Sequence, residues 1–475
     1  MNFRVPSSIR LFVESLITLL LLLFLSLNLN LKAQEAPLDS YLNTALQSNI
    51  ALQKQELSYE KSLAALKEAK GLFFPKLSIE ARYSVAKGGR AFEIPIGDLM
   101  NPVYDNLNLI NNFGQSASPD YPTIPDYPQI ENEQVNFLRE TEHETTVRVA
   151  MPVFNTAILQ NHRIKQNMVE AEKISVGIYK RELVKEVKTA YFNYAKAAQA
   201  LDLYNNTLNL VEENLRTTES LHRNHKVTID VVYAAKAEVE EVKQEVAVAE
   251  KDAKTAQAYF NFLLNREYDS DIELIAETDF PQSAISLENA RKQALNSREE
   301  LQQLNYYLAV SDNNIQLNKN SHLPNVNLVA DYGFQGTHYR FTSEDDFAMG
   351  SLVLSWNLFD KTTKARVQQA KIEKDVVQQQ KNEVFQQVGL QVVNTFYDLE
   401  AAQKSIASAS AEVDAAQKAF RLVNKKYSQG QANLVEFTNA RTQLTNAEQK
   451  LIIAKYDYQV KLANFERATA GYVFE

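Results

Sequence analysis

Two stretches of this chain resemble each other, and the match runs at two different constant offsets. Pro75 corresponds to Pro324, an offset of 249 (324 − 75), whereas Phe154 corresponds to Phe359, an offset of 205 (359 − 154). The first stretch therefore carries 44 additional residues (249 − 205) between the two matched segments. A long unit that is present twice predicts a fold built by internal duplication, in which neither half is complete alone.

The composition favours long helices and excludes several kinds of site. The 475 residues include only 12 glycines and 12 prolines, whereas good helix formers are frequent. The chain has no cysteine, which excludes disulfides and thiolate metal sites. Its formal net charge of −9 argues against a nucleic-acid partner, because phosphate backbones attract basic surfaces.

The first 33 residues have the pattern of a secretory signal peptide. Arg4 and Arg10 precede an apolar run over residues 16–29, and cleavage is expected after Ala33. An uncleaved membrane anchor is the alternative. No later segment has the length and apolar character of a transmembrane helix, so strands must make any membrane crossing of the mature chain.

Four segments of about ten residues alternate between apolar and polar side chains, which indicates strands with two unlike faces. In the first, Leu77, Ile79 and Tyr83 share one face, whereas Glu80 and Arg82 share the other. This length and alternation are typical of tilted outer-membrane strands, and an ordinary half-buried sheet is the alternative. The four predicted strands are residues 76–87, 143–154, 325–336 and 347–359.

Helical spacing of apolar residues fills most of the remaining chain. Two predicted helices contain about 67 residues and would each be roughly 100 Å long, which exceeds any ordinary globular core. Four shorter ones would pack end to end beside them in a coiled-coil manner. The six predicted helices are residues 38–70, 156–222, 229–264, 287–320, 361–427 and 433–470.

These elements group into two repeats joined by a linker. The first repeat covers residues 34–264, the linker 265–286 and the second repeat 287–475. The additional sequence of the first repeat, residues 88–136, is rich in Pro, Asn, Asp and Tyr and is interpreted as an irregular outer loop. It joins two strands at the ends opposite the helices, so it should lie at the outer tip.

Three local motifs, together with the export signal and the duplicated helix–hairpin–helix units, carry a family resemblance. The motifs are LPNVNL at 323–328, LSWNLFD at 354–360 and YSQGQANLVE at 427–436. With them the chain resembles the TolC-type outer-membrane efflux channels over essentially the whole mature sequence. The resemblance implies a mixed fold, in which three protomers contribute four strands each to a 12-stranded membrane β-barrel that continues as a long α-helical coiled-coil barrel.

Physical arguments agree with a homotrimer. Four strands leave two open edges that outer-membrane lipid cannot satisfy. Two protomers would give eight strands and a filled interior, whereas three would give twelve strands and a lumen. The apolar faces would then contact lipid, and the polar faces would line the lumen with Glu80, Arg82, Arg148 and Asp331.

The family resemblance also implies that the two helical turns farthest from the membrane bind a periplasmic adaptor protein, which connects the channel to an inner-membrane pump. Gly430 suits the left-handed backbone of a tight helix reversal, but His225 occupies its equivalent in the first repeat, so equal docking by both turns is in doubt. A simple turn is the alternative. The docking candidates are Gly430, Gln431, Ala432 and Leu434 in the second repeat, and Val227, Thr228 and Ile229 in the first.

Acidic residues beside these turns are candidates for a periplasmic gate. Glu436 lies where the family often carries an acid, and three symmetry-related carboxylates around a narrow opening would attract cations. Asp230 is one position out of register with Glu436 in the first repeat, and Asn439 replaces a second family acid. The alternative for each carboxylate is a solvated surface role.

Other functions find little support in the sequence. There is no phosphate-binding loop, zinc-protease motif or nucleophile elbow, so we expect neither an enzyme nor a cofactor. His222 and His225 could share a helical face, but exposed turn histidines are far more common than metal sites of this kind. A secreted coiled-coil scaffold that binds partners without forming a pore remains the alternative from another functional class.

Overall fold

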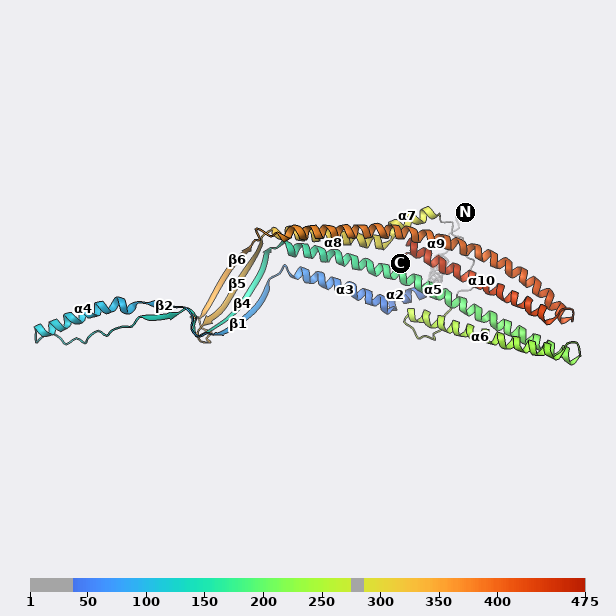
Figure 1. The fold of residues 1–475 in the computed structure, drawn as a ribbon, viewed down its shortest axis with the longest axis horizontal. Coiled ribbons are helices and arrows are strands. Elements are labelled where there is room, and N and C mark those ends of the chain that lie inside the picture. The colour runs from blue at the N-terminus through green and yellow to red at the C-terminus, as the bar shows by residue number, and fades with distance from the viewer. Residues whose placement is uncertain (1–36, 275–285, 475) are drawn as a thin grey trace, which may run out of the picture. The chain divides into compact units, whose positions relative to one another are not determined.

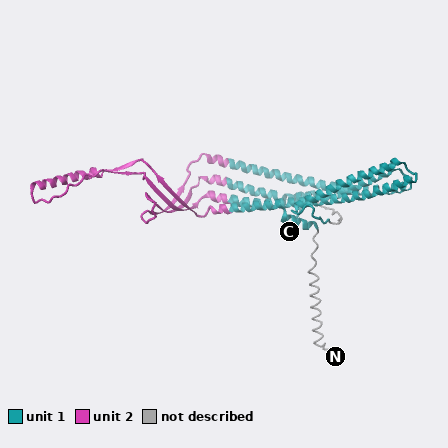
Figure 2. Ribbon diagram, turned by 90° about the horizontal axis from the view of Figure 1, so that it is seen from below, with its two compact units in different colours: residues 1–66, 163–314, 369–475 teal, residues 67–162, 315–368 magenta. Residues whose placement is uncertain are grey.

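A computed structural model describes residues 37–274 and 286–474, which divide into two units (Figure 2). Of the described residues, the helical unit comprises 37–66, 163–274, 286–314 and 369–474, and the strand unit comprises 67–162 and 315–368. The predicted signal peptide, residues 1–33, and half of the predicted linker, residues 275–285, lie outside the described residues.

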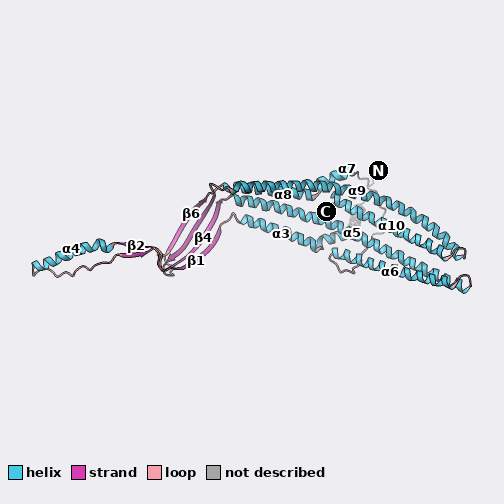
Figure 3. Ribbon diagram, in the orientation of Figure 1, coloured by secondary structure: helices cyan, strands magenta, loops and turns pink. Residues whose placement is uncertain are grey.

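Helices and strands follow one another in the order that the sequence predicts, with additional elements inside the outer insert (Figures 1 and 3). In chain order they are α2 (Pro37–Ser48), α3 (Ile50–Gly71), β1 (Lys76–Val85), β2 (Ala91–Ile94), α4 (Ile96–Ala117), β3 (Glu133–Asn136), β4 (Thr141–Phe154), α5 (Thr156–Arg223), α6 (Ile229–Leu263), α7 (Leu287–Ser297), α8 (Glu299–Lys319), η1 (Asn320–His322), β5 (Asn325–Gly336), β6 (Asp346–Ser355), α9 (Thr362–Ser428) and α10 (Leu434–Thr469).

The strand unit contains a four-stranded antiparallel sheet with the order β1-β4-β5-β6. Pro75 and Pro324 immediately precede β1 and β5, because proline ends a helix but is tolerated at the first position of a strand. β6 ends at Ser355, earlier than the predicted 359. The side chain of Asp360 instead accepts hydrogen bonds from the N–H and the hydroxyl of Thr362 at the start of α9. Asp360 therefore stabilises the first turn of the helix and is not part of the strand.

The strand register separates the two faces as the alternation predicts. Arg148 lies opposite Asp331 on one face, whereas Ile79 lies opposite Val147 on the other. The second face is apolar and exposed, and Ile79 is 72% accessible in the isolated protomer. Among the described residues the sheet order ends at β1 and β6, so each of these strands has a neighbour on one side only.

The prediction of an irregular loop over residues 88–136 is wrong. The insert contains the 22-residue helix α4 and the small antiparallel sheet β2-β3. An extended segment returns along α4 and is fixed to it by asparagine side chains. Asn108, for example, both donates to the carbonyl of Tyr127 (3.1 Å) and accepts from its N–H (2.8 Å). The side-chain amide thus makes the pair of hydrogen bonds that a neighbouring strand would make in a sheet. Because Asn and Pro are usually associated with loops, composition alone does not predict this arrangement.

Two predicted helices are each divided in two. The helix predicted over 38–70 breaks at Asn49, and the one over 287–320 breaks at Arg298. At both positions a buried polar side chain holds the interruption. Asn49 accepts a hydrogen bond from the N–H of Leu52 (3.0 Å), and the extended backbone of Arg298 separates α7 from α8. Propensity alone did not reveal these breaks, because the flanking sequences are strongly helical.

The long helices α5 and α9 each support one apolar cluster in the helical unit. Around α5, the cluster contains Val187, Tyr191 and Phe260; around α9, it contains Val392 and Phe465. Phe260 and Phe465 are related by the 205-residue offset (465 − 260), as are Val187 and Val392 (392 − 187). Each cluster therefore uses equivalent positions of the long helix and of the helix that returns along it.

Candidate functional site

The turn between α9 and α10 has the conformation that its sequence predicts. Gly430 adopts a left-handed backbone with φ of +73°, and the N–H of Gln431 donates to the carbonyl of Lys426 (2.8 Å). Asn433 then caps α10 by accepting from the N–H of Glu436 (2.9 Å). This is a glycine-terminated helix followed at once by a capped one, which makes a tight reversal.

The turn between α5 and α6 has the same backbone pattern without a glycine. His225 takes the left-handed conformation at φ of +55°, and the N–H of Lys226 donates to the carbonyl of Leu221 (2.9 Å). Left-handed backbone costs a residue with a side chain about 1–2 kcal/mol. His222 supports the turn through a 3.0 Å contact between its Nδ1 and the carbonyl of Val227.

The predicted docking and gate residues occupy these two turns and the helix starts that follow. Thr228 precedes α6 without a side-chain capping bond, unlike Asn433 before α10. Glu436, Asp230 and Asn439 are all exposed. Glu436 also contacts the side-chain amide of Asn433 at 3.3 Å, so its carboxylate contributes to helix capping as well as carrying charge.

The structure adds an ion pair that the sequence did not predict and that links the two helical hairpins within the helical unit. The guanidinium of Arg441 on α10 lies 3.1 Å from the carboxylate of Glu238 on α6, and both side chains are less than one-tenth exposed. The same carboxylate accepts a hydrogen bond from Thr438 (3.1 Å). Arg441 follows the buried Phe437 by four residues, so helical spacing places it on the apolar face of α10. This position is the feature of the sequence that could have indicated a buried arginine.

A second contact joins the hairpins near the turns. The hydroxyl groups of Thr218 on α5 and Tyr427 on α9 lie 2.9 Å apart, and both side chains are buried. The ring of Tyr427 also packs against Phe437, with the ring centres 5.0 Å apart. Separating the hairpins at this end therefore requires that a buried ion pair and a buried hydroxyl contact be broken together.

Farther from the turns, buried charges join α5, α8 and α10. The Arg467 guanidinium lies between Glu182 (3.0 Å) and Glu300 (2.7 Å), and Arg298 contacts Glu300 at 2.8 Å. Burial alone would raise the pKa of Glu300, but the hydrogen bonds and charges of Arg298 and Arg467 lower it to about 2. This carboxylate is therefore fully ionised at neutral pH and holds two cations in place.

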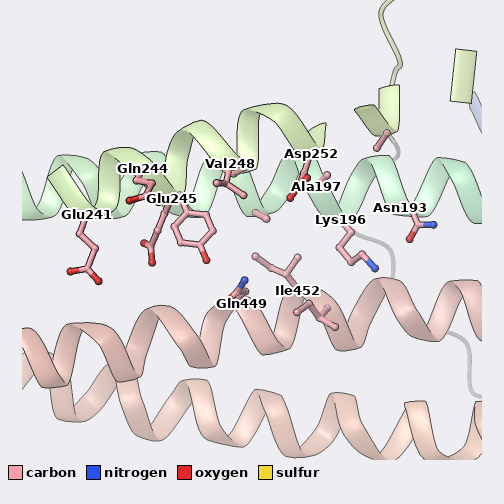
Figure 4. A pocket seen from close by; sticks show the side chains of 15 residues that line it. Asn193, Lys196, Ala197, Glu241, Gln244, Glu245, Val248, Asp252, Gln449 and Ile452 are labelled. Carbon is pink, nitrogen blue, oxygen red and sulfur yellow. The ribbon is translucent and has the colours of Figure 1, made fainter. Parts of the chain in front are cut away.

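A cavity of about 650 Å³ lies between α5, α6 and α10 (Figure 4). Glu241 and Glu245 extend toward it from α6, and Lys196 lies at its edge. Burial raises the pKa of Glu245, although the nearby Arg441 opposes this. The part of the chain that the structure describes contains no group of three or more His, Cys, Asp or Glu that could hold a metal ion.

Three of the four predicted lumen residues meet on the polar face of the sheet. Arg148 contacts Asp331 at 2.8 and 3.1 Å and Glu80 at 3.4 Å. Arg82 pairs instead with Glu144 at 2.9 Å, a partner that the sequence did not identify. The polar face therefore carries a row of alternating charges across three strands. Among the described residues, no helix is both long and apolar enough to cross a membrane.

Comparisons with known proteins give one consistent result. The profile of the outer membrane efflux protein family matches residues 290–471. The outer membrane protein TolC of Escherichia coli is 22% identical over 437 residues, which covers 89% of this chain and 79% of TolC. These comparisons confirm the resemblance to the TolC-type outer-membrane efflux family.

The TolC-type fold is also found among solved structures. The CmeC outer membrane channel of Campylobacter jejuni superposes with a TM-score of 0.73 at 14% identity, covering 92% of this chain and 86% of CmeC. The MtrE outer membrane channel of Neisseria gonorrhoeae, solved in its open state, superposes with a TM-score of 0.69 at 17% identity and covers 91% of this chain and 88% of MtrE. At such identities the match concerns the fold alone. The family consists of channels rather than enzymes, and its members lie in the outer membrane.

Proposed function

We propose that this chain is the exit duct of a tripartite efflux or secretion system, which passes substrates from the periplasm to the exterior. The observation that carries the proposal is the four-stranded sheet with one charged face and one exposed apolar face. It is joined to helices of 68 and 67 residues, which are roughly 100 Å long. Such helices can extend a membrane pore far into the periplasm.

Three protomers complete the pore in this proposal. β1 and β6 each leave one edge unpaired among the described residues, and a lipid-exposed edge would leave backbone groups without hydrogen-bond partners. Pairing β1 of one protomer with β6 of the next satisfies both edges. Twelve strands then enclose a lumen lined by Glu80, Arg82, Arg148 and Asp331. Because of the internal duplication, each protomer contributes two β-hairpins to this barrel, β1-β4 and β5-β6.

The turns at the ends of α5 and α9 are the proposed adaptor-docking sites, and the adaptor connects them to an inner-membrane pump. The proposal is supported by their shared backbone geometry and by the exposed side chains between the helices. Gating would separate the two hairpins of a protomer, with Glu436 and Asp230 beside the opening. The Glu238–Arg441 pair is placed to resist that separation.

The mature chain purified in detergent provides the test. The proposal expects light scattering to give the mass of three chains after subtraction of bound detergent, and expects planar bilayers to show ion conductance. A monomer that needs no detergent would instead support the secreted scaffold. A trimer without conductance, even after the Glu238–Arg441 pair is removed, would contradict the duct.

A further inference from the structure

The outer helix α4 has an apolar face that nothing in its own insert covers. Its residues recur at alternating spacings of four and three, which is the heptad pattern of a coiled-coil seam. The large members are well exposed, with accessible fractions of 69% for Leu99, 59% for Ile110 and 76% for Phe113. The set, here called the outer seam, is Leu99, Val103, Asn106, Ile110 and Phe113.

The opposite face of α4 is already occupied by the insert itself. Asn101 exchanges two hydrogen bonds with the backbone of Ile130 (2.9 and 2.8 Å), and Asn108 does the same with Tyr127. Successive helical residues are turned by about 100°, so Asn108 and Ile110 point in nearly opposite directions. The return segment therefore braces α4 from behind and leaves the outer seam facing away.

Charge identifies what the seam can contact. Between Arg90 and Arg139 the chain has seven acidic residues and no Lys or Arg. Helices that lie on membranes carry basic residues on their polar faces, and anionic headgroups repel an acidic insert. Neither acid of α4, Asp98 or Asp105, occupies a seam position. The seam therefore suits another charge-free apolar surface rather than a lipid surface.

We infer that this surface is the outer seam of two other copies of the same chain. The inference rests on the proposed trimeric barrel. The insert joins the Val85 end of β1 to the Thr141 end of β4, whereas α5 follows the opposite end of β4. Three protomers would thus bring three α4 helices to one end of the barrel, tethered at an effective concentration in the millimolar range.

Three parallel α4 helices then form a cap in which their seams meet on the symmetry axis. In this cap the side chains of Leu99, Ile110 and Phe113 leave water and pack against their counterparts in the other two protomers. The acidic residues stay on the periphery. Asn106 is the single polar position of the seam, and a polar residue at such a position fixes the register and number of helices in a coiled coil. The cap links the protomers beyond the membrane, independently of strand pairing.

The absence of cysteine from the chain allows a direct test, because each introduced thiol is the only one. Ile110→Cys lies on the seam, and Asn112→Cys, two residues later, is an exposed control on the other side of the helix. In the full chain in detergent, mild oxidation should give disulfide-linked dimers, and a three-armed maleimide should give covalent trimers. The cap predicts a linked fraction on the order of tenfold higher for Ile110→Cys than for the control.

Three further measurements separate the possible failures. If light scattering shows no trimer, the proposed duct fails; if the trimer is present and both cysteines link equally, the cap alone fails. A fluorophore attached to the thiol of the Ile110→Cys variant that is quenched by brominated lipid, without cross-linking, would assign the seam to lipid and overturn the cap. Finally, Ile110→Asp combined with Phe113→Asp should abolish cross-linking through Leu99→Cys while the trimer mass persists; continued cross-linking would contradict the seam.

Discussion

The side-chain amide of Asn49 donates a hydrogen bond to the backbone carbonyl of Leu263, 2.9 Å away, and so joins the break between α2 and α3 to the end of α6. In the second half of the chain, Arg298 donates to the carbonyl of Ala468 at 3.1 Å. These positions differ by 249 (298 − 49) and 205 (468 − 263), the same offsets that relate the two matched stretches. Both halves thus stack two shorter helices against a long one and hold the junction with a buried side chain.

Replacing Asn49 by Asp should isolate the contribution of this bridge. Aspartate can still accept from the N–H of Leu52, but it cannot donate to the carbonyl of Leu263, which then loses a partner in a buried setting. An unsatisfied buried group costs about 1–3 kcal/mol. We expect faster amide hydrogen exchange at the end of α6 and in α2, measured by mass spectrometry. Lys61→Ala, at an exposed position on α3, is the control and should leave exchange unchanged.

Local patterns predicted the strands and the long helices because period-two alternation and helical spacing need no distant partner. The Gly430 turn was equally accessible, since left-handed backbone favours glycine. The break at Asn49 was not, because it depends on a carbonyl more than two hundred positions away. The sequence also carries a signal for α4, because Leu99, Val103 and Ile110 have helical spacing, but asparagines such as those that brace this helix are more typical of loops.

The same limit explains the omissions at the candidate site. Glu238 and Arg441 lie on separate hairpins, and no spacing in the sequence places them together. The charged network around Glu300 likewise depends on how α5, α8 and α10 pack. In contrast, the alternation of the strands sufficed to place Glu80, Arg148 and Asp331 on one face, because register follows from alternation once the strands pair.

Breaking the Glu238–Arg441 pair should loosen the contact between the hairpins. Glu238→Gln removes the carboxylate that lies 3.1 Å from Arg441 and leaves Glu245 as the remaining acidic side chain that acts on this guanidinium. The cost should therefore stay below the about 3–5 kcal/mol of a buried charge that loses its whole partner. We expect a higher open fraction in planar bilayers. Combining Glu238→Gln with Arg441→Met removes both charges and should restore stability while the channel stays easier to open. Lys236→Ala, which removes an exposed pair to Glu219 within one hairpin, should behave as the wild type.

The ionised state of Glu300 makes the helical unit sensitive to acid. Its pKa is about 2 in the folded chain, below the ordinary value of 4.5, so its stabilising effect is complete above pH 4.5. That contribution is lost as the pH falls from about 4.5 toward about 2. Thermal melts followed by circular dichroism should therefore show that the Tm falls less over this pH window in Glu300→Gln than in the wild type. Glu400→Gln, on an exposed helix face beside Lys404, should retain the wild-type decrease.

Substitutions at the equivalent positions Gly430 and His225 should change the stability of the two turns in opposite directions. Gly430→Ala forces a side chain into left-handed backbone, whereas His225→Gly relieves that strain in the other turn. Nothing lies within 4 Å of a methyl group built on Gly430, so strain rather than collision sets the cost. At about 1 kcal/mol, exchange of the turn amides should become about fivefold faster in Gly430→Ala and slower in His225→Gly. Equal responses would contradict the assignment of strain to His225.

The charge of Glu436 can be tested without disturbing its helix. Glu436→Gln keeps the backbone N–H that Asn433 caps and keeps a side-chain oxygen for the Asn433 amide, so α10 should begin as before. If three such carboxylates ring the periplasmic opening, removing them should lower the preference for cations over anions, measured as a reversal potential in a salt gradient. Glu412→Gln, on α9 and paired with Lys450, is a control of equal charge change on an exposed helix face. Equal selectivity in the two variants would place Glu436 outside the ion path and leave it only its capping role.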